Sequence, residues 1–248
     1  MSTYLTTGFV LRARPWREHA RLYTLLTERY GKVEVVAAGG QKLSAKLTPH
    51  LMPFAEVEVM VARGKQLDRL AGANLRQVYL KPPYHLSTAV LGTTLLEVID
   101  ALTRTDEADS KLYDLLRRHL RELGQLPVRD EIWRPQARWL LASFIVEVLK
   151  ILGLTLLLTH CEKCRGELVE PVVFSWLSHG FYHHTCLPAG EQGVELSPGA
   201  LAWFQRASET SVTAQEALPA SALAFLTDYV RGQAGRDLYT IHVLRSIL

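Results

Sequence analysis

The chain has 248 residues, of which 48% are hydrophobic and 21% charged, and its formal net charge is +3. This composition is typical of a globular protein and excludes a disordered tail, a collagen and a disulfide scaffold. The length suits one large domain or two to three small ones. We expect no secretory signal at the start of the chain. The most apolar stretch, residues 139–158, contains Glu147 and Lys150, so we expect a buried helix there rather than a membrane span.

The charge is unevenly distributed along the chain. Residues 1–81 contain 13 Lys and Arg against 6 Asp and Glu, whereas the remainder contains 15 basic and 19 acidic residues. A basic segment attracts phosphate polyanions, and its field speeds their encounter. The pattern is therefore compatible with nucleic-acid binding, although an ordinary solvated surface would also explain it.

Residues 1–80 predict β-strands separated by glycine and proline turns. In residues 9–14, Phe9, Leu11 and Ala13 alternate with Val10, Arg12 and Arg14; further runs occupy 33–37, 57–61 and 74–80. Val57, Val59 and Val61 alternate with Glu56, Glu58 and Met60, which predicts one buried and one wetter face. About five strands in this length favour a closed barrel, either of the oligonucleotide-binding (OB) or of the SH3-like kind.

Lys81-Pro82-Pro83 marks the clearest boundary, because two prolines suit neither a strand ladder nor a helix interior. Leucine stripes at helical spacing then predict three helices within 86–153, and Ser197-Pro198 and Pro219 open later ones, which could pack back on the middle bundle. We therefore predict an α+β multidomain protein, with a five-stranded OB-fold barrel, a helical bundle, an inserted zinc-binding hairpin module and carboxy-terminal helices. The expected domains are 1–81, 82–159, 160–190 and 191–248.

The three cysteines predict a metal site rather than a disulfide framework. Cys161 and Cys164 form a CxxC pair, with Gly166 expected to relieve the turn, and His183 and Cys186 repeat the two-residue spacing. Two such knuckles joined by a hairpin can close a tetrahedral Cys3His site around one structural Zn2+, with no ligand position left open. His184, His160 and His179 are rival fourth ligands. A redox CxxC pair, free buried thiols or a site that has lost its metal are the competing interpretations.

No catalytic motif emerges from the sequence. It contains no phosphate-binding loop, no GxGxxG and no GxSxG. Glu56 and Glu58 fit a solvated barrel exterior better than an acid–base pair. Single histidines are expected to be surface residues or residues capped by a hydrogen bond rather than ligands; they stand at positions 19, 50, 85, 119 and 242.

The order of motifs resembles the bacterial recombination-mediator family RecO. The resemblance covers nearly the whole chain, and it includes the regions Gly8–Leu11, Arg14–Glu18, Leu25–Lys32, Ala38–Lys42 and Leu51–Phe54. The knuckles lie where many family members have four cysteines, one of which is replaced here by histidine. The turn Gly39-Gly40-Gln41-Lys42 also carries less positive charge than the commoner version.

The resemblance implies a non-enzymatic DNA repair protein in the cytoplasm, associated with the nucleoid and not with a membrane. It would bind single- and double-stranded DNA, anneal complementary strands and, with RecR, help load RecA onto strands coated by single-stranded-DNA-binding protein (SSB). Basic residues at strand ends are the expected DNA-binding groups, with Trp16 as a base-stacking candidate or a barrel plug. They are Arg14, Trp16, Arg17, Lys42, Lys46, Arg63 and Lys65. Arg134 and Arg138 are candidates for binding the acidic SSB tail.

Two other functions remain open at this point. One is a zinc-dependent nucleotide hydrolase or deaminase, which would need an open metal position and a nearby acid such as Glu162 or Glu167. The other is a scaffold whose basic barrel docks an acidic protein. Both are compatible with the composition.

Overall fold

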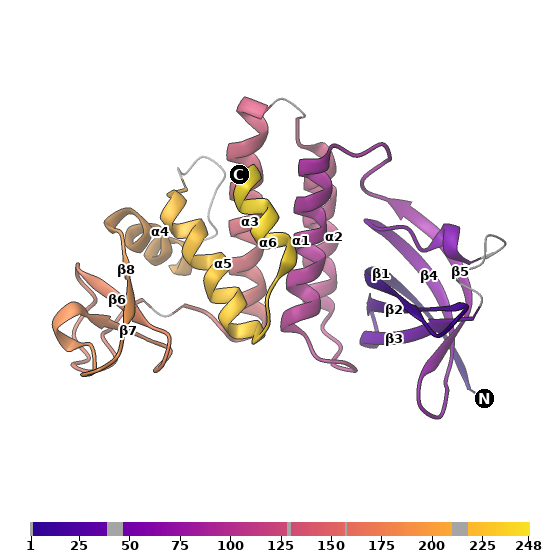
Figure 1. Cartoon of the computed structure of the whole chain (residues 1–248), viewed down its shortest axis with the longest axis horizontal. Coiled ribbons are helices and arrows are strands. Elements are labelled where there is room, and N and C mark those ends of the chain that lie inside the picture. Colours follow the sequence, from indigo (N-terminus) through magenta and orange to yellow (C-terminus); the bar gives the residue numbers. More distant parts are fainter. Residues whose placement is uncertain (1, 39–46, 128–129, 157, 210–217) are drawn as a thin grey trace. The chain divides into compact units, whose positions relative to one another are not determined.

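The computed structural model describes residues 2–38, 47–127, 130–156, 158–209 and 218–248, and the chain divides into two compact units (Figure 1). Unit 1 comprises Met1–Trp133 and Leu238–Leu248, and unit 2 comprises Arg134–Asp237. The domain boundaries expected after residues 81, 159 and 190 would separate parts of the chain that fold independently. These boundaries stay predictions. In the structure, the barrel shares its unit with three helices.

Unit 1 begins with a closed five-stranded barrel in the order β1-β2-β3-β5-β4, which confirms the OB-fold prediction. Neighbouring strands are antiparallel except for β3 and β5, which pair in parallel. A 3₁₀ turn, Thr48–His50, precedes β4. The strands are β1 (Thr3–Trp16), β2 (Ala20–Thr27), β3 (Gly31–Ala37), β4 (Ala55–Ala62) and β5 (Asp68–Val78).

The barrel interior follows the predicted alternation on β4 but not on β1. Val57, Val59 and Val61 are fully buried, as expected for alternate residues of a strand with one inward face. On β1, by contrast, the consecutive residues Phe9 to Leu11 are all buried. The pairing with β2 shifts between Val10 and Arg12, and the outward ring of Phe9 is covered by Tyr113 of a helix, 5.0 Å between ring centroids. The simple alternation predicted for residues 9–14 is therefore wrong.

Three helices accompany the barrel in unit 1. They are α1 (Leu86–Leu102), α2 (Ser110–Gln125) and α6 (Tyr239–Ile247). The α2 helix begins where the Asp109 carboxylate accepts hydrogen bonds from the first free backbone N–H groups, and its leucine stripe is buried as predicted. The α6 helix packs on α1, although almost 140 residues separate them in the sequence. The carboxyl-terminal segment therefore belongs to the same unit as the barrel.

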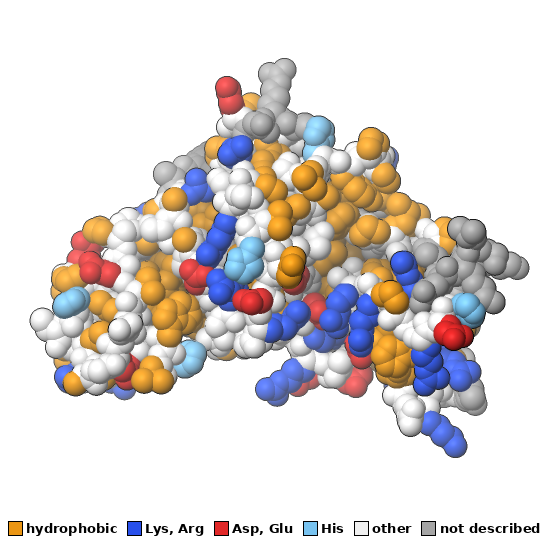
Figure 2. Space-filling view, viewed as in Figure 1, with side chains coloured by type: hydrophobic (Ala, Val, Ile, Leu, Met, Phe, Trp, Pro, Cys, Tyr) orange, Lys and Arg blue, Asp and Glu red, His pale blue; other side chains and the backbone are white. Residues whose placement is uncertain are grey.

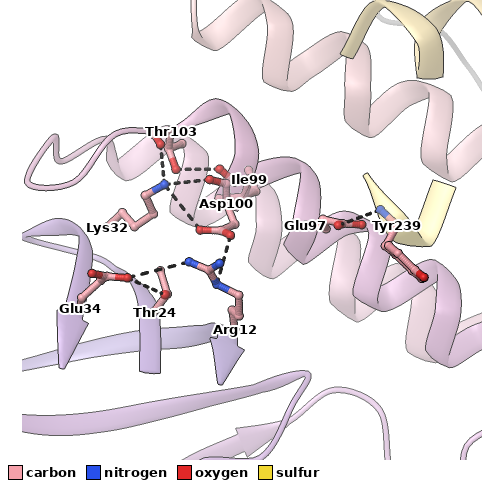
Figure 3. Close-up of polar contacts among 9 residues, drawn as sticks. All are labelled: Arg12, Thr24, Lys32, Glu34, Glu97, Ile99, Asp100, Thr103 and Tyr239. Atoms are coloured by element: carbon pink, nitrogen blue, oxygen red, sulfur yellow. Dashed lines mark hydrogen bonds and ion pairs between the residues drawn. The ribbon is translucent and has the colours of Figure 1, made fainter. Parts of the chain in front are cut away.

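Two buried polar bridges hold the helices against the barrel. Lys32 of β3 points at the carboxyl end of α1, where its Nζ donates to the carbonyl oxygens of Asp100 and Thr103 at 2.8 and 2.5 Å and lies 3.5 Å from the Asp100 carboxylate (Figure 3). A cation at this end of a helix compensates the free carbonyl groups. The Asp100 carboxylate also pairs with Arg12 of β1 at 3.6 Å.

The second bridge centres on Glu56, whose expected role as a solvated exterior residue is wrong. Its carboxylate accepts hydrogen bonds from the hydroxyls of Tyr79 and Tyr113 at 2.9 and 2.7 Å and from Arg117 at 3.1 Å. The outer face of β4 is covered by α2 at this point, which the alternation could not reveal. His119 of α2 is likewise buried, with Nδ1 at 3.0 Å from the Leu115 carbonyl, and not a surface histidine.

Unit 2 combines helices with a small antiparallel sheet in the order β7-β6-β8. Aromatic rings join the sheet to α5: the Phe174 ring lies 5.3 Å from that of Phe225 and 5.7 Å from that of Tyr229. Across the described parts of the chain, none of the helices has the length and apolar content needed to cross a bilayer. The elements are α3 (Asp130–Ile151), β6 (Val172–Ser175), β7 (Gly180–His183), β8 (Gly193–Leu196), α4 (Pro198–Glu209), α5 (Ala220–Ala234) and the 3₁₀ turn His184–Cys186.

Candidate metal site and nucleic-acid surface

The structure brings the four predicted ligands together in unit 2. Each of Cys161, Cys164, His183 and Cys186 offers one ligand atom, and these atoms all lie within 4.8 Å of one another. Such separations suit one ion with metal–sulfur bonds of about 2.3 Å. Cys161 is buried, whereas Cys164 is exposed. The chain therefore contains a Cys3His group that could bind one metal ion.

The first knuckle is a tight turn closed by its own backbone. The Cys161 N–H donates to the Gly166 carbonyl at 2.8 Å, and the Arg165 N–H donates to the Cys161 carbonyl at 2.9 Å. Gly166 was expected to relieve the turn, but the residue with a positive φ is Arg165, at 60°. A Cβ at Gly166 would lie 3.5 Å from the Cys164 sulfur, which is an ordinary van der Waals contact, so the space beside the group does not require glycine.

The orientation of His183 identifies it as the fourth member of the group. Its Nε2 lies 2.8 Å from the Glu167 carbonyl, and its Nδ1 lies 3.4 Å from the Cys164 sulfur. A carbonyl acceptor on the far nitrogen is the arrangement that fixes the tautomer of a metal-binding histidine. Among the described residues, the rivals His160, His179 and His184 stay outside the group.

The thiols of the group differ in pKa. Burial raises the pKa of Cys161, but backbone N–H groups of Cys164, His183 and Lys163 donate to its sulfur and bring the value down to about 6. The pKa of Cys186 is raised by burial and by its hydrogen bonds to Cys164 and Cys161. Because it accepts hydrogen bonds from several backbone N–H groups, the Cys161 sulfur is suited to hold a negative charge, as a metal thiolate requires.

The donor set also limits what chemistry the site can support. Three thiolates and one imidazole complete a tetrahedral coordination, which is typical of structural sites. Of the two acids considered for catalysis, Glu162 pairs with Arg165 at 3.0 Å. The residues present therefore fit a resident ion that stabilises the fold of unit 2.

A second site is defined by the strand ends of the barrel. In the barrel pairing, Arg21 of β2 lies opposite Ala37, Val36 of β3 opposite Arg69, and Arg69 of β5 opposite Ala62. These neighbours place the start of β2, the end of β3, the start of β5 and the end of β4 along one edge. The β1–β2 loop (17–19) and the β4–β5 loop (63–67) both leave the barrel there, and we call this region the basic edge. Corresponding loops of OB folds contact oligonucleotides.

The predicted DNA-binding residues that are described gather at the basic edge. Arg14, Arg17, Arg63 and Lys65 are exposed, and Trp16 is half-buried at the end of β1. Within the described part of the chain, Arg14, Arg63 and Lys65 form no ion pair. Lys42 and Lys46, together with the turn Gly39–Lys42, lie outside the described residues.

Away from the basic edge, several basic side chains are held by carboxylates. Arg76 pairs with Glu58, Arg117 with Glu56 and Asp114, and Lys32 with Asp100. These charges are locally neutralised, so they contribute little to the attraction of a polyanion. Lys and Arg side chains gather over the barrel in Figure 2. At the basic edge, by contrast, no carboxylate among the described residues neutralises Arg14, Arg63 or Lys65.

Two features of the basic edge were not visible in the sequence. Arg21 and Arg69 belong to it through strand pairing alone, and neither was among the predicted residues. Two arginines are also stacked on aromatic rings: the Arg14 guanidinium lies 5.4 Å from the Trp16 ring centroid, and that of Arg63 lies 5.2 Å from the ring of Tyr4. The register of a closed barrel, which brings these residues together, cannot be read from local patterns.

The residues proposed for the acidic tail lie on α3. Arg134 is exposed and Arg138 half-buried, and a spacing of four places them on one face of the helix. An apolar hollow in unit 2 lies further along α3, lined by Leu149, Leu156 and Phe204 beside Lys150. Neither Arg134 nor Arg138 lines this hollow, and the Lys150 Nζ donates to the Ala207 carbonyl at 2.8 Å. The assignment of the two arginines to the acidic tail stays a prediction.

Together, an OB-fold barrel with a basic edge, a helical region and a Cys3His module define a modular α+β protein. The chain matches two family models along most of its length, "Recombination protein O N terminal" over residues 1–79 and "Recombination protein O C terminal" over residues 84–240. It belongs to the RecO family of DNA repair proteins.

Curated relatives agree with this assignment. The chain is 30% identical over 210 residues to the DNA repair protein RecO of Geobacter metallireducens, with 85% of this chain and 82% of the relative aligned. The protein of the same name from Symbiobacterium thermophilum is 29% identical over 209 residues, covering 83% and 80%. That of Trichodesmium erythraeum is 30% identical over 166 residues, but the aligned part spans 66% of this chain and 58% of the relative.

Proposed function

We propose that this chain binds single- and double-stranded DNA at the basic edge and anneals complementary strands without catalysing a covalent step. The observation that carries the proposal is a group of exposed basic residues that form no ion pair within the described part of the chain. They are Arg14 at the end of β1 and Arg63 and Lys65 in the β4–β5 loop, beside the loops that OB folds use for oligonucleotides. Phosphate contacts carry no base code, so binding is sequence-tolerant. A surface that holds two strands lowers their mutual repulsion and leaves base pairing to select the partner.

The Cys3His group supports the absence of catalysis in this proposal. We assign it one structural Zn2+, because thiolate and imidazole donors favour that ion and four protein ligands leave no position for a reactive water. A zinc-dependent nucleotide enzyme would need such an open position. Metal analysis of the purified protein, combined with a nucleotide turnover assay, tests this assignment.

The partners proposed for the chain follow from its family. We propose that it acts with RecR to help load RecA onto SSB-coated single strands in the cytoplasm, at the nucleoid. The acidic tail of SSB would bind to α3 near Arg134 and Arg138. Replacing both arginines by alanine should weaken capture of a synthetic tail peptide, and unchanged capture would contradict this assignment.

The central experiment measures the binding of the whole chain to fluorescent single- and double-stranded oligonucleotides by anisotropy. We compare the wild type with a fourfold reversal to glutamate at the basic edge (Arg14, Arg17, Arg63 and Lys65). The matched control reverses four exposed basic residues elsewhere in unit 1 (Lys81, Arg104, Lys111 and Arg121). Both variants change the net charge equally, so loss of binding only in the first supports the basic edge. An equal loss in both, or in neither, contradicts it.

A further inference from the structure

The β4–β5 loop of the basic edge holds one arginine in a defined position on an aromatic ring. The guanidinium of Arg63 lies over the ring of Tyr4, with Cζ 5.2 Å from the ring centroid. Tyr4 is itself packed against Tyr30, with 4.2 Å between ring centroids. Both rings also pack on the core of the barrel. One face of the Arg63 guanidinium therefore lies on a half-buried pair of aromatic rings, and the side chain is exposed to solvent.

A single carboxylate ties this loop to the ring. Asp68, the first residue of β5, accepts a hydrogen bond from the Tyr4 hydroxyl at 3.4 Å and another from the Gly64 N–H at 3.0 Å. The Arg63 N–H donates to the Ser2 carbonyl at 3.0 Å. The loop is too tight for a side chain at Gly64, where a Cβ would lie 1.9 Å from the Leu67 carbonyl oxygen. Burial and the neighbouring Asp68 charge raise the pKa of Tyr4 to about 12, so its hydroxyl remains a donor at neutral pH.

This arrangement suits a nucleobase better than a phosphate alone. A guanidinium is planar, and bases of single strands stack on such planes as they do on aromatic rings. Bases within a duplex are already stacked on one another, so they would gain no comparable stacking energy from a guanidinium. In the described part of the chain, no carboxylate pairs with Arg63, which leaves its plane available. Lys65, two residues further along the same loop, offers only a mobile point charge.

We propose that Arg63, held on Tyr4 by Asp68, is a base-stacking platform that makes the basic edge favour unpaired strands over duplex. Asp68 acts as a positioning residue, which accounts for an acidic side chain within a surface of the opposite charge. The inference rests on the proposed function, since it names the part of the ligand that one loop of the same surface recognises.

The test compares three ligands of equal length and charge per strand: a single strand, the same backbone without bases, and the duplex. Arg63→Lys keeps the charge but removes the plane, and we expect about a tenfold loss of affinity for the single strand only. Lys65→Ala is the matched control; we expect weaker binding to all three ligands and a shallower salt dependence. Equal binding of wild type and Arg63→Lys to the single strand would overturn the inference, as would an equal loss on the baseless strand.

Substitution of Asp68 separates a role of its charge alone from a role in positioning the loop, because the two roles predict opposite changes in affinity for the single strand. If this residue contributed only its negative charge, Asp68→Asn would tighten binding to every ligand. Positioning of the loop predicts weaker binding to the single strand, with no loss on the baseless strand. Tyr4→Phe, which keeps the ring but removes the hydroxyl, should reproduce that pattern in a chain whose thermal unfolding matches the wild type. If instead the fourfold reversal at the basic edge leaves all binding intact, the proposed function itself fails.

Discussion

Glu56 connects the outer face of the barrel to α2 through hydrogen bonds from Tyr113 and Arg117, and its carboxylate accepts a third from Tyr79, which directly follows β5. The Glu56 side chain is 13% exposed, so little water can replace these partners. We expect Glu56→Gln to lower the free energy of unfolding by about 1–3 kcal/mol in urea titrations, because a charged acceptor is lost among buried donors. Glu58→Gln on the same strand is the control and should cost under about 1 kcal/mol, since its partner Arg76 is exposed. Equal losses in the two variants would contradict the bridge.

The tyrosines of this bridge also determine how stability responds to alkaline pH. Burial and the hydrogen bond to Glu56 raise the pKa of Tyr79 to about 12, and burial likewise raises the pKa of Tyr113. In the unfolded chain a tyrosine loses its proton near pH 10. The unfolded state therefore releases protons first, and the stability contributed by Tyr79 is present below pH 10 and lost as the pH rises towards 12. Chemical unfolding of wild type and Tyr79→Phe across this range should show a smaller decline in the variant.

Among the elements, α6 depends on a residue far from it in sequence. The Glu97 carboxylate of α1 accepts a hydrogen bond at 3.0 Å from the Tyr239 N–H (Figure 3). It accepts another from the Thr240 N–H, also at 3.0 Å. An anion at this position satisfies the free donors of the helix start and suits its dipole. Glu97→Ala should therefore destabilise α6 by about 1 kcal/mol, seen as faster hydrogen exchange of its amides. Glu122→Ala on α2 should leave α6 unchanged; protection that survives Glu97→Ala would show that apolar packing alone holds the helix.

The Cys3His module makes a second prediction at this scale. Removing the buried Cys161 sulfur, as in Cys161→Ser, should abolish metal binding and lower the melting temperature of the transition that involves β6, β7 and β8. Chelation of the wild type should have the same effect. His184→Ala, beside the group but outside it, should retain one bound ion. Metal content by atomic spectroscopy and near-ultraviolet circular dichroism of the Phe174 cluster measure both effects. Retention of the metal by the Cys161→Ser variant would contradict the assignment of Cys161 as a ligand.

Some features of these elements could be predicted from the sequence, whereas others could not. Spacing alone predicted the members of the Cys3His group, because the two knuckles are local and each needs only a short turn. Val57 to Val61 likewise showed the inward face of β4. The roles of Glu56 and Lys32 were not predictable, since each is decided by a helix that packs on the barrel from elsewhere in the chain. Arg21 and Arg69 meet at the basic edge only through the register of a closed sheet.

At the scale of the molecule, the uneven charge predicts a steep dependence of DNA binding on salt. If about four to six phosphates are neutralised at the basic edge, the logarithm of the association constant should fall with that of the salt concentration at a slope of about −3 to −5. Anisotropy titrations between about 50 and 200 mM salt measure it. An affinity that does not change with salt would mean that phosphate contacts are not what holds the DNA.

The return of the chain to α1 has a consequence for how the protein responds to proteolysis. The backbone leaves unit 1 after Trp133, within α3, and re-enters it at Leu238, so unit 2 is joined to unit 1 at both of its ends. A single protease cut in an exposed turn such as that at Leu177 would leave two fragments, each with a part of unit 1. Because α6 remains docked on α1, the nicked protein should migrate as one species in gel filtration and separate only under denaturing electrophoresis.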